Sequence, residues 1–442
     1  MALSGLDIYK LLPKTNCREC GFATCLAFAM QLAKKAVTID KCPYLNEETK
    51  RVLEASSLPP VKLVSVGTGE TKLEVGNETV MFRHEEKFHH PCGLGFIIED
   101  TLTDAEIKQR LEKINSFKFE RVGQSLSVNL VAIKQKKDAK RFQETVKLVL
   151  NNTPLALVLM SDDPEALRLA LEISKTRNPL IYRVTKNNLT GVSQLAKEYK
   201  VPLVVSGESL EGISNLTREL NTLGVTDLIL QTQDKSINQK LWDSTQIRRQ
   251  ALKKSNRSLG YPLLSLVEEE DPCKECIEVA TYIVKYAGII LMKGIEPWQI
   301  FSLLTLRQNI YSDPQKPLQI EPKLYAIGAV SERSPVLVTT NFSLTYYTVL
   351  GEVEASKIPS YILSVDTEGM SVLTAWAAEK FTPDKINDSL NKFEAASVVS
   401  HKRLIIPGYV AVMSGDLEEG SGWQVVVGPK EAAGIPSFLK NL

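Results

Sequence analysis

The chain has 442 residues, of which 53 are Lys or Arg and 52 are Asp or Glu, so its formal net charge is +1. Binding to nucleic acid or to an anionic membrane requires a strong excess of basic residues, so we expect neither partner. The N-terminus lacks a basic segment followed by an apolar run, and no apolar stretch approaches about 18 residues. We therefore expect a cytoplasmic protein, and the length predicts two to four domains.

Four of the seven cysteines lie near the N-terminus, in the order Cys17-x₂-Cys20-x₄-Cys25-x₁₆-Cys42. This spacing differs from the paired Cys-x₂-Cys motifs of zinc ribbons, and a chain of this length does not need disulfides to fold. Thiolates are soft ligands that suit iron–sulfur clusters, and Gly21 lets the loop turn through positive φ. We predict a [4Fe-4S] cluster bound by these four cysteines, with structural zinc as the alternative.

The cysteine module is expected to span residues 1–57, with a helix over 26–33 and a linker from Ser56 to Pro60. Two alternating runs follow, at 61–66 and 73–82, and Gly76-Asn77 is the expected turn. Such a pattern predicts a β-hairpin, which we expect to cap the domain that follows.

From residue 95 on, apolar strand patterns alternate with amphipathic helix patterns such as 164–173 and 210–220. This alternation predicts a parallel sheet covered by helices. Eight strands in series would close into a (β/α)₈ barrel of the TIM type, with an open doubly wound sheet as the alternative. The barrel domain is expected over 58–325, with strands at 126–133, 155–160, 179–184, 201–206, 226–231, 261–267, 287–292 and 323–328.

Residues 326–442 predict a compact α/β domain, with strands near 336–339, 361–365, 404–409 and 423–428 and a helix over 371–381. The turn at Asp366–Thr374 follows a strand and precedes the helix, and ligands of open α/β sheets bind at this edge. A plain connecting loop is the alternative. Similar turns are expected at Thr339–Phe342 and Pro407–Tyr409.

Two further groups of side chains could carry chemistry. Cys273 and Cys276 form an isolated Cys-x₂-Cys pair, and His84, His89 and His90 lie close to Cys92 in the sequence. We expect the cysteine pair to be helix-start thiols partly packed under the barrel, with a redox pair or half of a metal site as the alternative. We expect the histidines to lie on a solvated hairpin arm, with metal binding as the alternative. Phosphate-loop, dinucleotide-binding and nucleophile-elbow motifs are absent, and the chain has four histidines, so its chemistry is expected to reside in bound cofactors.

The motif Cys-Arg-Glu-Cys-Gly-Phe-Ala-Thr-Cys…Lys-Cys-Pro, followed by a barrel and a small α/β domain, resembles the large (gamma) subunit of the corrinoid iron–sulfur protein of the acetyl-CoA synthase/CO dehydrogenase (reductive acetyl-CoA) pathway. The resemblance covers the whole chain in domain order. It implies a methyl carrier of the methyltransferase type, whose corrinoid accepts a methyl group from methyltetrahydrofolate as methyl-Co(III) and donates it to the Ni-Fe-S cluster of acetyl-CoA synthase. The [4Fe-4S] cluster would return Co(II) to Co(I).

The resemblance also implies the residues that bind each cofactor. Cys17, Cys20, Cys25 and Cys42 match the cluster ligands, and Thr374 would lie near the lower face of cobalt. The Asp-x-His-x-x-Gly motif that supplies a cobalt ligand elsewhere is absent, which implies a cobalamin-type corrinoid bound base-off. The implied corrinoid-binding residues are Thr340, Asn341, Phe342, Tyr346, Gly369, Met370, Ser371, Val372, Leu373, Thr374, Pro407, Gly408 and Tyr409.

Implied partners are the small subunit of a heterodimer, the methyltetrahydrofolate:corrinoid methyltransferase, acetyl-CoA synthase/CO dehydrogenase and a low-potential reductant such as ferredoxin. Two other functions stay open from the sequence. One is an iron–sulfur electron-transfer adaptor without corrinoid, and the other is a pterin-dependent methyltransferase built on the barrel.

Overall fold

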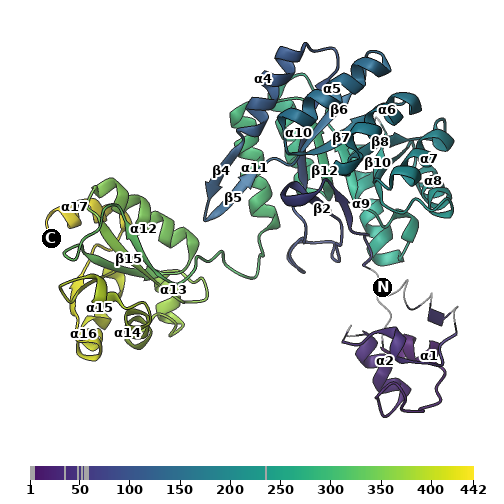
Figure 1. The fold of residues 1–442 in the computed structure, drawn as a ribbon. Helices are drawn as coiled ribbons and strands as arrows, with labels where there is room; N and C mark the ends of the chain where they lie inside the picture. The colour runs from purple at the N-terminus through teal and green to yellow at the C-terminus, as the bar shows by residue number, and fades with distance from the viewer. Residues whose placement is uncertain (1–4, 34–35, 47–48, 51–52, 54–58, 234–235) are drawn as a thin grey trace. The chain divides into compact units, whose positions relative to one another are not determined.

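The computed structural model of the protein describes residues 5–33, 36–46, 49–50, 53, 59–233 and 236–442 (Figure 1). Most of the expected linker at 56–60 lies outside the described residues. By its internal contacts the chain divides into two compact units, one made of 1–118 with 126–311 and the other of 119–125 with 312–442. Among the described residues, no helix combines the length and the apolar character that crossing a membrane requires.

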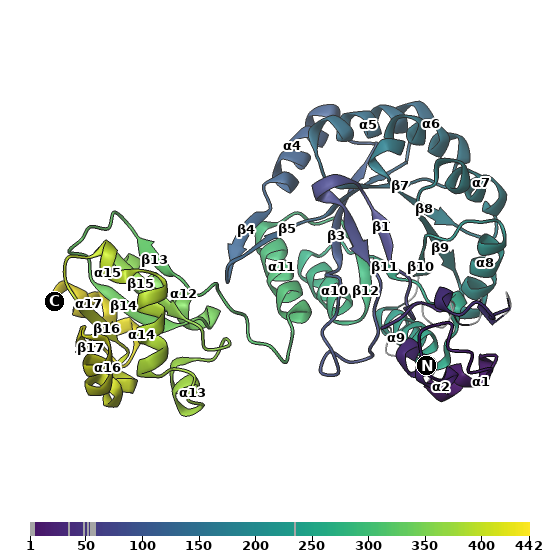
Figure 2. The same cartoon turned by 60° about the horizontal axis from the view of Figure 1, so that its bottom comes forward.

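The first unit contains a closed barrel of eight parallel strands, which confirms the predicted architecture. The strands are apolar on both faces because one face lines the barrel and the other packs under helices. Figure 2 shows helices α4 to α8 in an arc around the strands. In chain order the barrel elements are β3 (Gly93–Glu99), α4 (Asp104–Asn115), β6 (Leu130–Lys134), α5 (Ala139–Asn152), β7 (Ala156–Met160), α6 (Pro164–Ser174), β8 (Leu180–Val184), α7 (Leu189–Tyr199), β9 (Leu203–Gly207), α8 (Leu210–Thr222), β10 (Leu228–Thr232), α9 (Ile237–Lys254), β11 (Leu263–Leu266), α10 (Pro272–Val284), β12 (Ala287–Met292) and α11 (Pro297–Tyr311).

The strand expected at 323–328 is not part of the barrel, and the strand that takes its place is β3. The sequence did not predict β3, because Gly93 and Gly95 lie at its start and glycine has a low strand propensity. At Gly95 a Cβ atom would lie 2.7 Å from Cδ2 of Leu291 and 3.1 Å from Cβ of Leu130, so glycine leaves room for both side chains. Residues 126–133 were also predicted as one strand, but they divide between β6 and the end of β5 (Gln124–Ser127), which pairs with β4 (Lys118–Arg121) in a short hairpin.

The predicted hairpin exists, but its turn was placed wrongly. Strands β1 (Val64–Val66) and β2 (Leu73–Val75) pair antiparallel around the turn at 67–72, and not around Gly76-Asn77. Gly67 and Gly69 adopt positive φ and form this tight turn. The hairpin's valines pack with Ala156 and Leu180, the first residues of β7 and β8. It therefore caps the amino-terminal end of the barrel, as expected.

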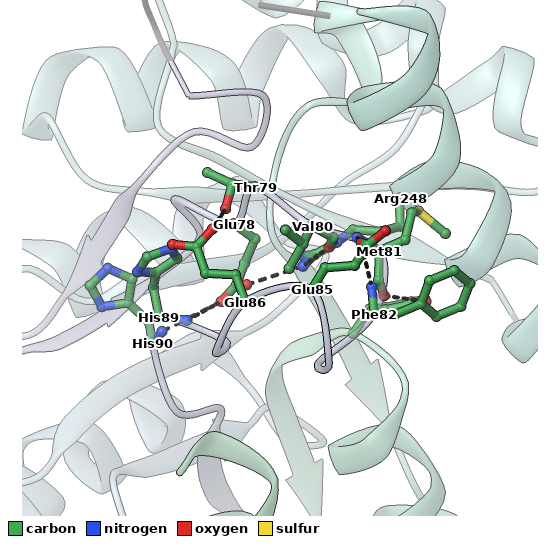
Figure 3. A network of polar contacts seen from close by, with 11 residues as sticks. Glu78, Thr79, Val80, Met81, Phe82, Glu85, Glu86, His89, His90 and Arg248 are labelled. Carbon is green, nitrogen blue, oxygen red and sulfur yellow. Dashed lines mark hydrogen bonds and ion pairs between the residues drawn. The ribbon is translucent and has the colours of Figure 1, made fainter. Parts of the chain in front are cut away.

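A segment that follows the hairpin, residues 76–92, is fastened to α9 by a buried ion pair (Figure 3). Arg248 Nη2 lies 3.0 Å from a Glu78 carboxylate oxygen, and its Nε donates to the Val80 carbonyl oxygen at 3.0 Å. The other Glu78 oxygen accepts the backbone N–H groups of His89 (3.0 Å) and His90 (3.4 Å). These contacts satisfy both buried charges.

The second unit contains a five-stranded sheet in the order β13-β15-β14-β16-β17, with β13 antiparallel and the other four parallel. This mixed sheet matches the α/β domain predicted for the C-terminal region. Its elements are β13 (Leu324–Ile327), β14 (Val336–Thr340), α12 (Ser343–Ser356), β15 (Ser360–Val365), α13 (Val372–Ala377), α14 (Pro383–Lys392), α15 (Ala395–Val398), β16 (Arg403–Ile406), α16 (Ser414–Ser421), β17 (Gln424–Val427) and α17 (Ile435–Lys440).

Replacing Arg248 tests the ion pair of the 76–92 segment. In Arg248→Leu the Glu78 carboxylate stays buried without its charge partner, so we expect the free energy of unfolding in urea to fall by about 3–5 kcal/mol. The exposed neighbour Arg249 provides the control, because Arg249→Leu should change stability by no more than about 0.5 kcal/mol. Equal stabilities of the two variants would contradict this assignment.

Candidate functional sites

The cysteine loop is shaped by backbone turns between α1 (Gly5–Leu11) and α2 (Cys25–Ala33). Asn16, Arg18 and Gly21 all have positive φ, and the Gly21 N–H donates to the Arg18 carbonyl oxygen at 2.9 Å. The Asn16 side-chain oxygen accepts the Cys25 N–H at 2.8 Å, which fixes the loop to the start of α2. Apart from its chain neighbours, no atom lies within 4 Å of the position that a Cβ on the exposed Gly21 would occupy, so the space beside this residue is open.

The four cysteines of the module differ in exposure. Cys17 is exposed and Cys20 is half-buried, whereas Cys25 and Cys42 are buried in the apolar cluster of this module. Burial raises the pKa of the Cys42 thiol, and negative charge on Cys20, Cys17 and Cys25 raises it further. All three other cysteines therefore lie close enough to Cys42 to interact with it electrostatically.

These thiols suit an iron–sulfur cluster in chemistry and in number. In the described ranges, no three His, Cys, Asp or Glu side chains are grouped closely enough to hold a metal ion, so the case for a cluster rests on the number and the chemistry of the thiols. Four thiolates, three from one loop and the fourth from Cys42 further along the chain, are the donor set that a four-iron cluster uses. The open space at Gly21 adds room beside that loop.

The second candidate site lies at the carboxyl edge of the C-terminal sheet. The chain passes from β14 to β15 on one side and then crosses to β16 on the other, so the loops after β14 and β16 diverge. Ligands of open α/β sheets bind at such a switch point. The strand order thus produces a crevice at the loops that the sequence had singled out.

A hollow of about 380 Å³ opens at this switch point and is mostly apolar. It is bounded by the ends of β14 and β16, by α12, and by the segment after β17. Five of the predicted corrinoid-binding residues line it, namely Phe342, Ser371, Val372, Pro407 and Tyr409.

The other eight predicted residues do not line the hollow, and they fall into three groups. Leu373 and Thr374 are exposed on α13, and the Thr374 hydroxyl lies 3.0 Å from that of Ser371. Tyr346 is buried among Tyr325 and Tyr347. The remaining residues belong to the loop framework beneath the edge: Thr340, Asn341, Gly369, Met370 and Gly408.

Asn341 organises this framework although it is only 1% exposed. Its side-chain oxygen accepts the N–H groups of Thr367 (2.9 Å) and Gly369 (3.0 Å) and the Thr367 hydroxyl (3.0 Å). Its amide nitrogen donates to Gln319 (3.3 Å) and Asp366 (3.2 Å). Asn341 therefore acts as a positioning residue that shapes the loop after β15.

The hollow also has features that the sequence did not reveal. Its floor contains Leu337 and Val349, and its wall is completed by Gly428-Pro429 after β17. Gly428-Pro429 could have been found from the sequence, because a glycine or proline after a strand also marks the other turns of this edge. Leu337 and Val349 could not have been found in this way, because in the sequence they cannot be told from aliphatic residues of the core.

The hydroxyls and the rim of the hollow fit a large ligand with polar arms. The side-chain oxygens of Thr339, Thr340, Ser343 and Ser364 are buried and, within the described residues, have no hydrogen-bond partner. Of these four residues, Thr339 lines the hollow. Around the hollow, five large apolar side chains are 43–75% exposed: Leu344, Leu373, Trp376, Tyr409 and Val412. An apolar rim of this kind favours a broad apolar ligand or a partner surface that covers the edge.

The remaining candidate groups take part in the fold. Cys273 and Cys276 lie in the first turns of α10, where Asp271 accepts the Cys273 N–H at 2.8 Å. Burial and the nearby Cys273 raise the pKa of the Cys276 thiol, which opposes a reactive thiolate. Cys92 is fully buried, and burial raises its pKa to about 11.

Replacing Asn341 tests its positioning role. In Asn341→Leu the amide N–H groups of Thr367 and Gly369 lose their acceptor, so we expect their hydrogen exchange to accelerate about tenfold or more. Asn387→Leu is the matched control, because Asn387 lies on α14 outside this network. Unchanged exchange at both amides in Asn341→Leu would refute the role.

Comparison with known proteins gives consistent matches over the whole chain. Residues 63–439 match the family model for the CO dehydrogenase/acetyl-CoA synthase delta subunit, and residues 12–44 match the model for a putative Fe-S cluster. The corrinoid/iron-sulfur protein large subunit of Moorella thermoacetica is 45% identical over 441 residues, which cover 100% of this chain and 99% of that protein. The acetyl-CoA decarbonylase/synthase complex subunit gamma of Methanocaldococcus jannaschii is 35% identical, covering 99% and 96%.

Among solved structures, the dihydropteroate synthase of Thermus thermophilus aligns with a TM-score of 0.40 and 13% identity, covering 57% of this chain and 100% of that one. The sequence matches are far stronger, and they include both the cysteine module and the C-terminal domain. The chain belongs to the family of corrinoid/iron-sulfur protein large subunits and acetyl-CoA decarbonylase/synthase gamma subunits.

Proposed function

We propose that this protein is the corrinoid-dependent methyl carrier of its pathway. The N-terminal module would hold a [4Fe-4S] cluster through Cys17, Cys20, Cys25 and Cys42, and the C-terminal domain would hold a base-off corrinoid. The observation that carries the proposal is the apolar hollow at the switch point of the C-terminal sheet, in a chain whose relative is named a corrinoid/iron-sulfur protein.

When bound, the corrinoid would supply the cobalt that carries the methyl group between methyltetrahydrofolate and acetyl-CoA synthase. Phe342, Val372 and Tyr409 would contact its apolar parts, and the unpaired Thr339 hydroxyl could bind a polar arm. The chain then has to hold the ligand, exclude water from one face and leave the other face accessible to partners.

Beneath the corrin, the 369–374 loop would form the support. Ser371 and Thr374 would present hydroxyls, and no imidazole, to the corrinoid. The Asn341 hydrogen bonds would hold the 369–374 loop in one conformation while different partners bind and dissociate. Several partners have to approach the same edge, and the proposed ones are the small subunit, the methyltransferase and acetyl-CoA synthase/CO dehydrogenase.

The cysteine module would serve as the redox activator of the carrier. Electrons from a low-potential reductant such as ferredoxin would enter there, and the cluster would restore the reduced cobalt after accidental oxidation. The proposed organisation is the cysteine module over 1–57, then the barrel with its hairpin, and a corrinoid-binding domain within the compact unit formed by 119–125 and 312–442.

Removing one cysteine separates activation from methyl transfer. In Cys42→Ala we expect the four-iron absorption and electron paramagnetic resonance signals to be lost, while methyl transfer with chemically reduced corrinoid persists. Cys273→Ala is the control and should keep about four irons per chain. Full iron content in Cys42→Ala, or loss of methyl transfer under chemical reduction, would contradict the assignment.

Filling the hollow tests the corrinoid site. Val372 lines it, so Val372→Trp should occupy the space and lower the cobalt content of the purified complex about tenfold. Val398→Trp, on α15 and outside the hollow, is the matched control. Iron and sulfide without cobalt in the unmodified protein would instead support an electron-transfer adaptor.

A further inference from the structure

A second hollow lies at the opposite edge of the C-terminal sheet, where its strands begin. It has a volume of about 170 Å³, and its floor is formed by Ile358, Ile405, Val426 and Leu439. Arg403, which lines it, is the first residue of β16, whereas the corrinoid-site hollow reaches Pro407, just past the end of that strand. The two hollows therefore open at different ends of the sheet.

Two arginine residues border this second hollow. Arg333 and Arg403 line it, both are exposed, and in the described part of the chain neither forms an ion pair. No Asp or Glu side chain is among the lining residues, although the terminal residue Leu442 is. Two like charges beside an apolar floor repel each other, and a bound anion would relieve that repulsion.

The backbone around both arginines is held in place by His401. The Arg403 N–H donates to His401 Nδ1 at 3.2 Å, so the proton of the ring lies on Nε2, which donates to the Ser334 carbonyl oxygen at 3.0 Å. The Ser400 N–H also donates to the Glu332 carbonyl oxygen at 2.8 Å.

The turn that carries Arg333 is closed internally as well. The Ser331 N–H donates to the Ser334 hydroxyl at 2.9 Å, and the Arg333 N–H donates to the Ser331 hydroxyl at 3.3 Å. The two arginines therefore project from backbone segments that are already ordered and tied together. Such preorganisation lowers the cost of binding.

We propose that this hollow binds a small organic anion, in which a carboxylate or phosphate lies between Arg333 and Arg403 and a short apolar body rests on the floor. Guanidinium groups bind either anion through paired hydrogen bonds. The volume is smaller than that of a drug-sized pocket, which limits the body to about the size of one ring. One floor residue, Ile405, also lines the hollow proposed for the corrinoid, but neither arginine does.

Calorimetric titration of the full-length protein tests this site with benzoate and phenyl phosphate as probes and benzyl alcohol as the neutral comparison. We expect at least one anion to bind saturably and benzyl alcohol not to bind. Arg333→Gln and Arg403→Gln should each weaken that binding about tenfold or more, because each removes one charge-assisted contact.

Two control variants test whether the anion binds in this hollow. Lys402→Gln removes an adjacent exposed charge that does not line the hollow and should leave the affinity unchanged, as should Val372→Trp in the other hollow. Both arginines are exposed, so circular dichroism should show unchanged folding. Absence of saturable binding by either anion, equal binding of benzyl alcohol, or unchanged affinity in both arginine variants would overturn the proposal.

Discussion

The side-chain amide of Asn341 is the interaction on which the C-terminal binding edge depends. One oxygen accepts three hydrogen bonds from the loop after β15, and the amide nitrogen extends the network to Gln319 and Asp366. A buried amide that uses this much of its bonding capacity specifies one loop conformation, because every alternative would leave buried polar atoms unpaired. The crevice of the switch point exists in its present shape because that loop cannot collapse into it.

The same sheet has different chemistry at its two ends. At the carboxyl edge the hollow is larger and apolar, with unpaired hydroxyls and an exposed apolar rim. At the amino edge it is smaller and bordered by two arginines. Both hollows lie against the ends of the central strands β14 and β16.

The sequence predicted those features that rest on local patterns. The four cysteines were recognisable because their spacing alone restricts the kinds of metal centre, and strands such as 155–160 and 287–292 were recognisable as bounded apolar runs. Strand β3 was not predicted, because Gly95 is needed to leave room for Leu291 and Leu130, which are distant in sequence. The run at 323–328 forms a strand, but nothing local specifies which sheet it joins. Likewise, Leu337 and Val349 face a hollow that only the assembled sheet defines.

The hairpin formed by β4 and β5 gives the chain an unusual connectivity. Its residues 119–125 belong by contact to the C-terminal unit, although barrel segments precede and follow them. At Gly123, a Cβ would lie 2.6 Å from the Tyr347 hydroxyl of α12, and burial together with Glu120 raises the pKa of that tyrosine. Three peptide connections, and not one, therefore join the units. A fragment that begins at Ser312 would lack part of its own surface, so the C-terminal unit is not a segment that can be excised by a single cut.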